Sequence, residues 1–149
     1  NHGKPYSLNE AIDHAKGKYV CYLDNDDNYY PNHIKPLVSA LEGQEKYQVA
    51  YSDLYKAHCR IEPDGRRVVL SKNIEVTRDF NRMLMFQFNH ALHVSLMHRR
   101  DLFEKTGKYT EELNVMIDWD MTRRMVFFAD FVILLISLLS RLLFFLLCF

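Results

Sequence analysis

Residues 18–27 read Lys18-Tyr19-Val20-Cys21-Tyr22-Leu23-Asp24-Asn25-Asp26-Asp27. An unbroken apolar run comes first, and three carboxylates follow it within four residues. This pattern predicts a strand buried on both faces, as in the parallel sheets of α/β proteins. Ligands of such sheets bind beyond the carboxyl ends of the strands, where these acidic residues would lie. Because neighbouring carboxylates repel one another, the cluster favours a bound divalent cation.

Helical patterns lie on both sides of this strand. Ser7 and Glu10 have the spacing of a capping box, and apolar residues then recur at helical spacing as far as Gly17. After the acidic cluster, the apolar spacing predicts a second helix that starts near Lys35, with Pro36 in its first turn.

The remaining chain continues to alternate between strand and helix signals. We expect strands at residues 47–52 and 92–97, a hairpin at 55–70 and a short helix at 99–105. Residues 78–88 are expected to form a helix or an irregular aromatic segment. Asp118 has the position of an N-cap for a further helix. The order of these elements predicts an α/β fold.

Length, charge and cysteine content limit the class of protein. The 149 residues suit one domain or part of one, and 48% apolar content is enough for a core. Nineteen basic residues balance nineteen acidic ones, so no net charge favours nucleic acid or an anionic membrane. Three irregularly spaced cysteines favour a reducing compartment. Residues 1–5 include neither a Met nor the start of a signal peptide, so we expect a cytoplasmic chain that begins within a longer protein.

Residues 131–149 differ from the rest of the chain. They are almost all apolar, with Arg141 as their one charged residue, and they carry no helix caps. Such a stretch has about the length of a short membrane span, and its Leu and Phe residues would offset the cost of one charge. We therefore expect a domain at residues 1–130 and a tail at 131–149. The tail is interpreted as a membrane anchor, a buried core helix or a non-native end.

Three segments together resemble a known family. Residues 9–27 resemble the centre of an inverting glycosyltransferase of family 2 with the GT-A fold, in which a helix leads into a strand that ends in L-D-x-D-D. Ile117-Asp118-Trp119-Asp120-Met121 resembles the family's E-D-W-D-L stretch. Residues 95–109 are similar to the strand, helix and "GGF" segment that precedes that stretch. The resemblance covers residues 1–130.

The resemblance implies a fold and a set of site residues. It implies an incomplete GT-A domain, with a mixed sheet flanked by helices, because the family's first strand and helix precede residue 1. Asp24, Asn25 and Asp26 would bind the donor, and Asp26 with Asp24 would hold the metal. Asp118 would be the catalytic base. Asn89, His90 and Trp119 would lie on the acceptor side.

The implied reaction moves a sugar from a nucleotide sugar to a hydroxyl acceptor with inversion. Mn²⁺ or Mg²⁺ would neutralise the diphosphate leaving group, and a carboxylate would take the acceptor's proton. The implied partners are a UDP-sugar and a saccharide or lipid-linked acceptor, as in the synthesis of cell-envelope polysaccharide. Two departures stand out: Leu8 occupies a position that is often Arg, and Ile117 occupies the position of the Glu before the base.

Other interpretations remain open. The chain could be an inactive fragment, associated with a membrane through residues 131–149. A phosphatase of the haloacid dehalogenase type also places D-x-D after a buried strand, but it usually has Thr or Val where this chain has Asn28. An acidic cluster can be a solvated turn, and Asp118 can be a plain N-cap.

An EF-hand is rejected because Tyr29 and Lys35 occupy its Gly and Glu positions. The neighbouring His90, His93 and His98 are expected to be ordinary, partly buried histidines.

Overall fold

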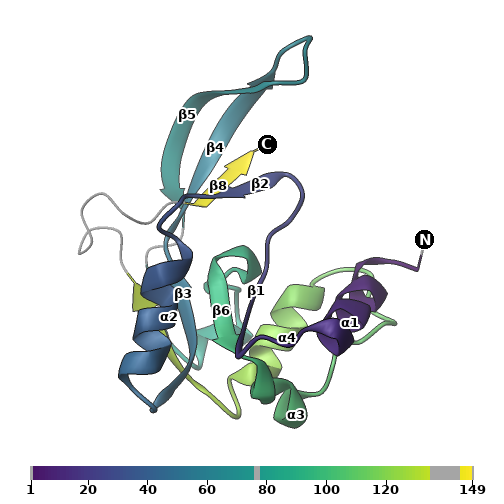
Figure 1. Ribbon diagram of the computed structural model, residues 1–149, viewed down its shortest axis with the longest axis vertical. Coiled ribbons are helices and arrows are strands. Elements are labelled where there is room, and N and C mark those ends of the chain that lie inside the picture. The colour runs from purple at the N-terminus through teal and green to yellow at the C-terminus, as the bar shows by residue number, and fades with distance from the viewer. Residues whose placement is uncertain (1, 76–77, 135–144, 149) are drawn as a thin grey trace.

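The computed structural model describes residues 2–75, 78–134 and 145–148 (Figure 1). Its main sheet has the strand order β1-β6-β3-β7, formed by Tyr19–Cys21, Leu96–Arg99, Tyr47–Ser52 and Asp130–Leu134. Strand β6 runs antiparallel to β1 and β3, whereas β7 runs parallel to β3. The sheet is therefore mixed, as expected, and the carboxyl ends of β1 and β3 meet at the same edge.

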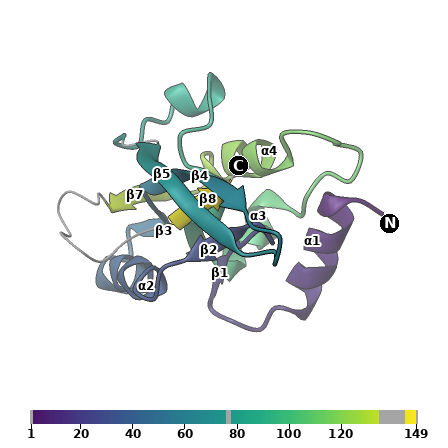
Figure 2. The same ribbon diagram turned by 90° about the horizontal axis from the view of Figure 1, so that it is seen from above.

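Helices cover both faces of the main sheet. They are α1, α2, α3 and α4, at Lys4–His14, Ile34–Gly43, Phe103–Thr106 and Ile117–Met125. Figure 2 shows α2 on one side of the molecule and α1 and α4 on the other. Leu37 of α2 packs with Met97 on one face, whereas Met121 of α4 packs with Leu96 on the other. The α/β prediction with flanking helices is confirmed.

Strand β3 has the buried character that the sequence predicted for the strand before the acidic cluster. Val49 and Tyr51 join the core cluster under α4, and Ala50 between them joins the cluster under α2. Strand β1 is less buried than expected: Tyr19 and Val20 are half-buried and Cys21 is exposed. Within the described residues β1 pairs only with β6, so one of its edges has no neighbouring strand.

A second sheet carries the predicted hairpin. Its order is β2-β8-β4-β5, formed by Asp27–Tyr29, Phe145–Cys148, Leu54–Ile61 and Arg67–Glu75. Strands β4 and β5 are antiparallel and project from the body of the molecule (Figure 1). Gly65 in the connecting turn has a φ of 82°, a conformation that glycine adopts without strain. Asp53, which is 1% exposed, is the single residue between β3 and β4.

The second helix and the short helix near residue 100 agree with the sequence, but the first helix does not. Helix α1 begins at Lys4, so the prediction of Ser7 as N-cap is wrong. Gly3 has a φ of 89° before the helix, and Pro5 occupies the first turn, where a missing N–H costs nothing. The hydroxyl of Ser7 donates to the carbonyl oxygen of Gly3 instead.

Residues 78–107 form only short regular elements, and residues 78–88 follow the irregular alternative of the prediction. Of residues 78–88, only Leu84–Phe86 form a single 3-10 turn. Residues 92–97 divide into a 3-10 turn at His93–Ser95 and the start of β6. The short helix expected at 99–105 is a 3-10 turn, Arg100–Leu102, followed by α3, and it ends at Gly107 with a φ of 71°.

The start of the apolar tail is part of the main sheet. Phe131 of β7 is 6% exposed and belongs to the core cluster under α4. The backbone of β8 pairs with β2 and β4. Residues 135–144 and 149 lie outside the described residues, so the interpretation of the tail stays a prediction. No described helix has both the length and the apolar composition of a membrane span.

Candidate active site

The acidic residues form a turn at the carboxyl end of β1. The N–H of Asp27 donates to the carbonyl oxygen of Asp24 at 3.1 Å, which closes the four-residue turn. Asn25 and Asp26 are exposed at its tip. The turn borders an open cleft of about 790 Å³, whose other wall is the first turn of α1, including Lys4 and Ser7. We call residues 24–27 the acidic turn.

Lys4 neutralises the first carboxylate of the acidic turn. Its Nζ lies 2.8 and 2.9 Å from the two carboxylate oxygens of Asp24. Both side chains remain partly exposed, so the ion pair can exchange with water or with a ligand. Both oxygens of Asp24 are therefore engaged by protein, which weakens the prediction that Asp24 is a metal ligand.

Asp27 is the buried carboxylate of the acidic turn. It is 8% exposed, and its Oδ1 is buried without a hydrogen-bond partner among the described residues. Burial raises the pKa of Asp27 to about 7, and the charges of Asp26 and Asp24 add to the rise. Lys4 and Arg67 act in the opposite direction. This site would therefore be stabilised by further positive charge.

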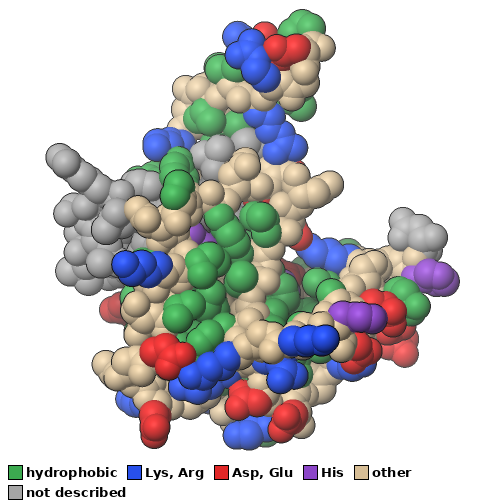
Figure 3. Space-filling view, in the orientation of Figure 1, with side chains coloured by type: hydrophobic (Ala, Val, Ile, Leu, Met, Phe, Trp, Pro, Cys, Tyr) green, Lys and Arg blue, Asp and Glu red, His purple; other side chains and the backbone are tan. Residues whose placement is uncertain are grey.

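Arg67 reaches the acidic turn from the hairpin. Its Nη1 donates to the carbonyl oxygen of Asp26, 41 residues away in sequence. Figure 3 shows basic side chains along the hairpin and an apolar surface between the hairpin and α1. The contact ties the start of β5 to the tip of the turn, beside the exposed carboxylate of Asp26.

Asp118 and Asn89, both predicted site residues, lie together. The side-chain Nδ2 of Asn89 donates to Oδ2 of Asp118 at 3.3 Å. Asp118 lies in the first turn of α4, which begins one residue earlier, so its prediction as the N-cap is wrong. Met116 occupies the N-cap position with a φ of 56°. The Asp118 carboxylate is thus available for a role other than capping.

The other acceptor-side candidates are held by the protein interior. His90 is 1% exposed, packs between Phe80 and Phe88, and accepts a hydrogen bond from the N–H of Asn81. The indole Nε1 of Trp119 donates to the carbonyl oxygen of Met85 at 2.7 Å. These contacts favour packing roles, so the acceptor-side hypothesis rests mainly on Asn89.

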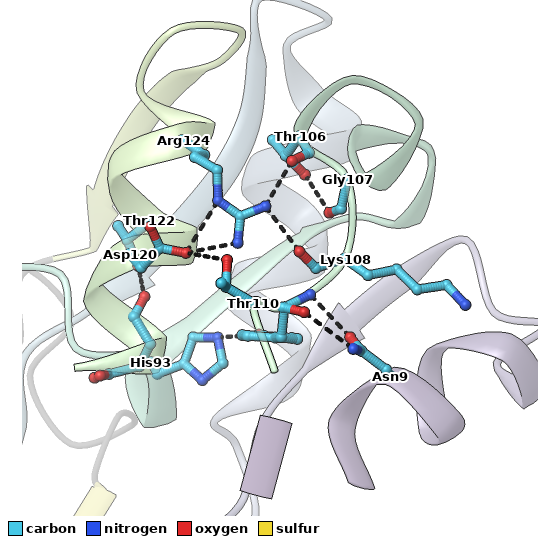
Figure 4. Close-up of polar contacts among 11 residues, drawn as sticks. Asn9, His93, Thr106, Gly107, Lys108, Thr110, Asp120, Thr122 and Arg124 are labelled. Carbon is cyan, nitrogen blue, oxygen red and sulfur yellow. Dashed lines mark hydrogen bonds and ion pairs between the residues drawn. The ribbon is translucent and has the colours of Figure 1, made fainter. Parts of the chain in front are cut away.

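A polar cluster fixes α4 against the loop that precedes it (Figure 4). Nη1 of Arg124 donates to the carbonyl oxygens of Thr106 and Lys108 at 2.6 and 2.8 Å. Nη2 of Arg124 donates to Oδ2 of Asp120 at 2.7 Å, and the hydroxyl of Thr110 donates to the same oxygen. Because Asp118 is two residues from Asp120, this cluster also fixes the backbone that carries the candidate base.

Asn9 joins α1 to the same loop. Its Oδ1 accepts from the N–H of Tyr109 at 2.8 Å, and its Nδ2 donates to the carbonyl oxygen of Tyr109 and to Glu111. All the polar atoms of this buried side chain are therefore paired. Asn9 connects the helix that carries Lys4 to the loop that leads to Asp118.

Buried histidine and tyrosine side chains fill the space beneath the sheet edge. The hydroxyl of Tyr22 donates to Nε2 of His98, because Nδ1 of His98 must donate to the carbonyl oxygen of Arg99. The ring of Tyr22 stacks on His93, which bonds to the hydroxyl of Tyr109 at 2.6 Å. Burial lowers the pKa of both histidines, to about 3 for His93 and about 4 for His98. They are interior residues, as the sequence suggested.

Three residues of this region were not predicted as site residues from the sequence. Lys4 and Arg67 contact the acidic turn only because α1 and the hairpin fold back onto it. Asp53 follows β3 as Asp24 follows β1, and both strands end at the same edge of the sheet. The signal for Asp53 was present in the sequence, since a carboxylate follows directly on the strand at residues 47–52.

The carboxylates of the acidic turn determine whether a divalent cation fits this site. No three His, Cys, Asp or Glu side chains of the described ranges are grouped as a complete metal site. The exposed carboxylate of Asp26 and the buried Oδ1 of Asp27, which has no hydrogen-bond partner in the described part of the chain, nevertheless suit an ion such as Mg²⁺. That ion usually takes one or two carboxylates and completes its shell with water and substrate phosphates. The residues fit such a partly hydrated ion.

Comparison with known proteins identifies the family. A family model described as glycosyl transferase family 2 matches residues 1–107. The chain belongs to this family. It is 27% identical over 131 residues to an uncharacterized glycosyltransferase of Rickettsia prowazekii, covering 81% of this chain and 38% of that protein. It is also 27% identical over 119 residues to a PGL/p-HBAD biosynthesis glycosyltransferase of Mycobacterium tuberculosis, covering 79% and 41%.

The fold is similar to that of proteins of known structure. The crystal structure of Staphylococcus aureus TarS residues 1–349 in complex with UDP matches with a TM-score of 0.69 at 16% identity. The match covers 99% of this chain and 40% of that one. The chain spans about two-fifths of the length of the two relatives named above. The GT-A prediction is confirmed for the fold.

Proposed function

We propose that the chain carries the donor and base residues of a glycosyltransferase that moves a sugar from a UDP-sugar to a hydroxyl acceptor with inversion. The observation that carries this proposal is the contact between Asn89 and Asp118 at the start of α4, in a chain of family 2. A saccharide or a lipid-linked hydroxyl compound would be the acceptor. Family membership favours this reaction over the phosphatase alternative, whose nucleophile would be Asp24, a carboxylate already held by Lys4.

Asp118 would act as the general base. It would take the proton of the acceptor hydroxyl as the acceptor oxygen bonds to the anomeric carbon of the donor. The bond from that carbon to the diphosphate oxygen would break at the same time, and UDP would leave. A single displacement of this kind inverts the anomeric configuration. The amide of Asn89 would hold Oδ2 of Asp118 and so orient the carboxylate.

The acidic turn would hold the donor. Asp26 would bind the cation, Mn²⁺ or Mg²⁺, which when bound supplies positive charge that neutralises the departing diphosphate. Asp27 would contribute a second, buried oxygen beside it, and Asn25 lies exposed at the tip of the same turn. The UDP in the TarS structure of the same fold supports the choice of UDP as the first nucleotide to test.

Calorimetric titration and a UDP-release assay test the proposal. We expect UDP to bind in the presence of Mn²⁺ and binding to be lost with EDTA or in Asp26→Ala. Asp118→Asn should keep UDP binding but lower sugar transfer about 10²- to 10⁴-fold. The exposed residues Asp101 and Glu112 provide the controls Asp101→Asn and Glu112→Gln, which should behave as wild type.

Two results would contradict the proposal. Transfer at the wild-type rate in Asp118→Asn would exclude that carboxylate as the base. A folded chain that binds no nucleotide with any divalent cation would favour the alternative of an inactive fragment.

A further inference from the structure

Two cationic side chains converge on the acidic turn from separate parts of the fold. Lys4 comes from the first turn of α1 and binds the carboxylate of Asp24. Arg67 comes from the start of β5 and binds the carbonyl oxygen of Asp26. The acidic turn therefore lies between α1 and the hairpin, held by one cation from each.

Each cation keeps donor groups beyond those that it uses on the turn. A guanidinium carries five N–H groups, and Arg67 uses its Nη1 on Asp26. The ammonium group of Lys4 is half-exposed and lines the open cleft beside the turn. Arg and Lys that bind a turn from the solvent side can form further charge-assisted hydrogen bonds to a phosphate.

The charge balance of the site depends on whether a divalent cation is bound. Asp24, Asp26 and Asp27 carry three negative charges when ionised, and Lys4 and Arg67 carry two positive ones. The excess of one negative charge attracts a cation. Once a divalent ion is bound, the excess becomes one positive charge, which attracts an anion. The site is thus suited to take a metal and a phosphorylated ligand together.

We propose that Lys4 and Arg67 bind the diphosphate of the donor, one from each side of the acidic turn. Lys4 exchanges one oxygen of Asp24 for a phosphate oxygen, and Arg67 uses its remaining N–H groups while it holds the turn. This inference rests on the proposed function for the identity of the nucleotide, UDP. The binding of a diphosphate group by Lys4 and Arg67 does not depend on which nucleotide carries it. It makes the hairpin, far from the family's acidic motif in sequence, a part of the donor site.

The experiment compares ligands that differ in phosphate content. UDP, uridine and inorganic diphosphate are titrated by calorimetry with Mn²⁺ into wild type, Lys4→Gln and Arg67→Gln. Lys16→Gln and Arg66→Gln are the matched controls, since Lys16 follows α1 and Arg66 pairs with Asp64 at the hairpin turn. Each test variant should bind UDP and diphosphate about tenfold more weakly, as expected for a lost hydrogen bond to a charged group. Uridine binding should not change, and the controls should match wild type.

A conservative variant separates phosphate binding from support of the turn. Arg67→Lys retains the charge but loses the fork of donors, so it should recover part of the diphosphate affinity. A purely structural role would weaken uridine and diphosphate equally, and that result would overturn the inference. Urea unfolding of every variant shows whether the folded population is the same.

The remaining outcomes distinguish this inference from the proposed function. Wild-type UDP affinity in both test variants would overturn the inference and leave the function standing. If the folded wild type binds diphosphate through Lys4 and Arg67 but not UDP, the inference holds and the choice of nucleotide is wrong. If the folded wild type binds neither ligand, both are wrong.

Discussion

The side-chain amide of Asn89 lies 3.3 Å from Oδ2 of Asp118, and the two residues come from segments 29 positions apart. Asn89 precedes the turn that leads into β6, and Asp118 lies in the first turn of α4. The Oδ1 of Asn89 is buried without a partner among the described residues. The amide orientation therefore directs its donor group to the candidate base.

Replacement of Asn89 should slow the reaction. Asn89→Ala removes the side-chain amide that holds Oδ2 of Asp118. We expect kcat/KM to fall about tenfold, at the low end for a hydrogen bond to a charged group because the contact is long. The control is Asn114→Ala, at an exposed position before α4. A wild-type kcat/KM in Asn89→Ala would show that Asn89 does not act on the base.

Replacement of Arg124 should destabilise the protein more than replacement of its neighbour. Arg124→Gln loses the ion pair with Asp120 and the bonds to two loop carbonyl oxygens. We expect the free energy of unfolding to fall by about 2 kcal/mol. Arg123→Gln loses the guanidinium over the rings of Trp119 and Phe86, worth about 0.5–1 kcal/mol. Urea unfolding compares the two variants, and equal losses would contradict the assignment of the cluster.

Three buried histidines should make the protein sensitive to acid. Burial lowers the pKa of His33 and His98 to about 4 and that of His93 to about 3. Below pH 6.5 the unfolded chain takes up protons at these residues and the folded chain does not. The free energy of unfolding should therefore fall as the pH drops from 6.5 towards 4. Urea midpoints at pH 7, 6 and 5 measure this loss, and His98→Gln should reduce it.

The carboxyl group of Asp27 should make the free energy of unfolding change with pH in the direction opposite to that of the histidines. Its pKa of about 7 lets the folded chain keep a proton that the unfolded chain releases above about pH 4. This contribution to stability is lost as the pH rises from about 4 to 7. Asp27→Asn removes it, so without metal the variant should lose stability more steeply on acidification than wild type. A slope equal to that of wild type would indicate an ordinary pKa for this carboxyl.

Local patterns were sufficient for the position of the acidic turn and for most elements. An apolar run that ends in carboxylates predicts a strand and a turn without reference to the rest of the chain. The start of α1 was missed because Ser7 and Glu10 have a capping-box spacing, whereas Gly3 and Pro5 start the helix earlier. Burial of β1 was overestimated, because burial depends on neighbouring strands that a single segment does not reveal.

The contacts within the site depended on packing between distant segments. Lys4 and Asp24 are 20 residues apart, and Arg67 and Asp26 are 41 apart. No periodicity relates such positions, so neither contact could be predicted from spacing. The family resemblance assigned Asn89 to the acceptor side and Asp118 as the catalytic base, but it did not predict their contact. Their hydrogen bond follows from the way α4 packs beside the loop at residue 89.

Because a single residue separates β3 from β4, the hairpin extends rigidly from the main sheet. Asp53 is buried, and the hydroxyl of Ser52 donates to its carbonyl oxygen, so the junction has little freedom to bend. Each strand residue adds about 3.3 Å to the arm. Two more residues in each strand would carry Arg67 about 7 Å further out, beyond reach of Asp26. The length of the hairpin therefore determines whether Arg67 can reach the acidic turn.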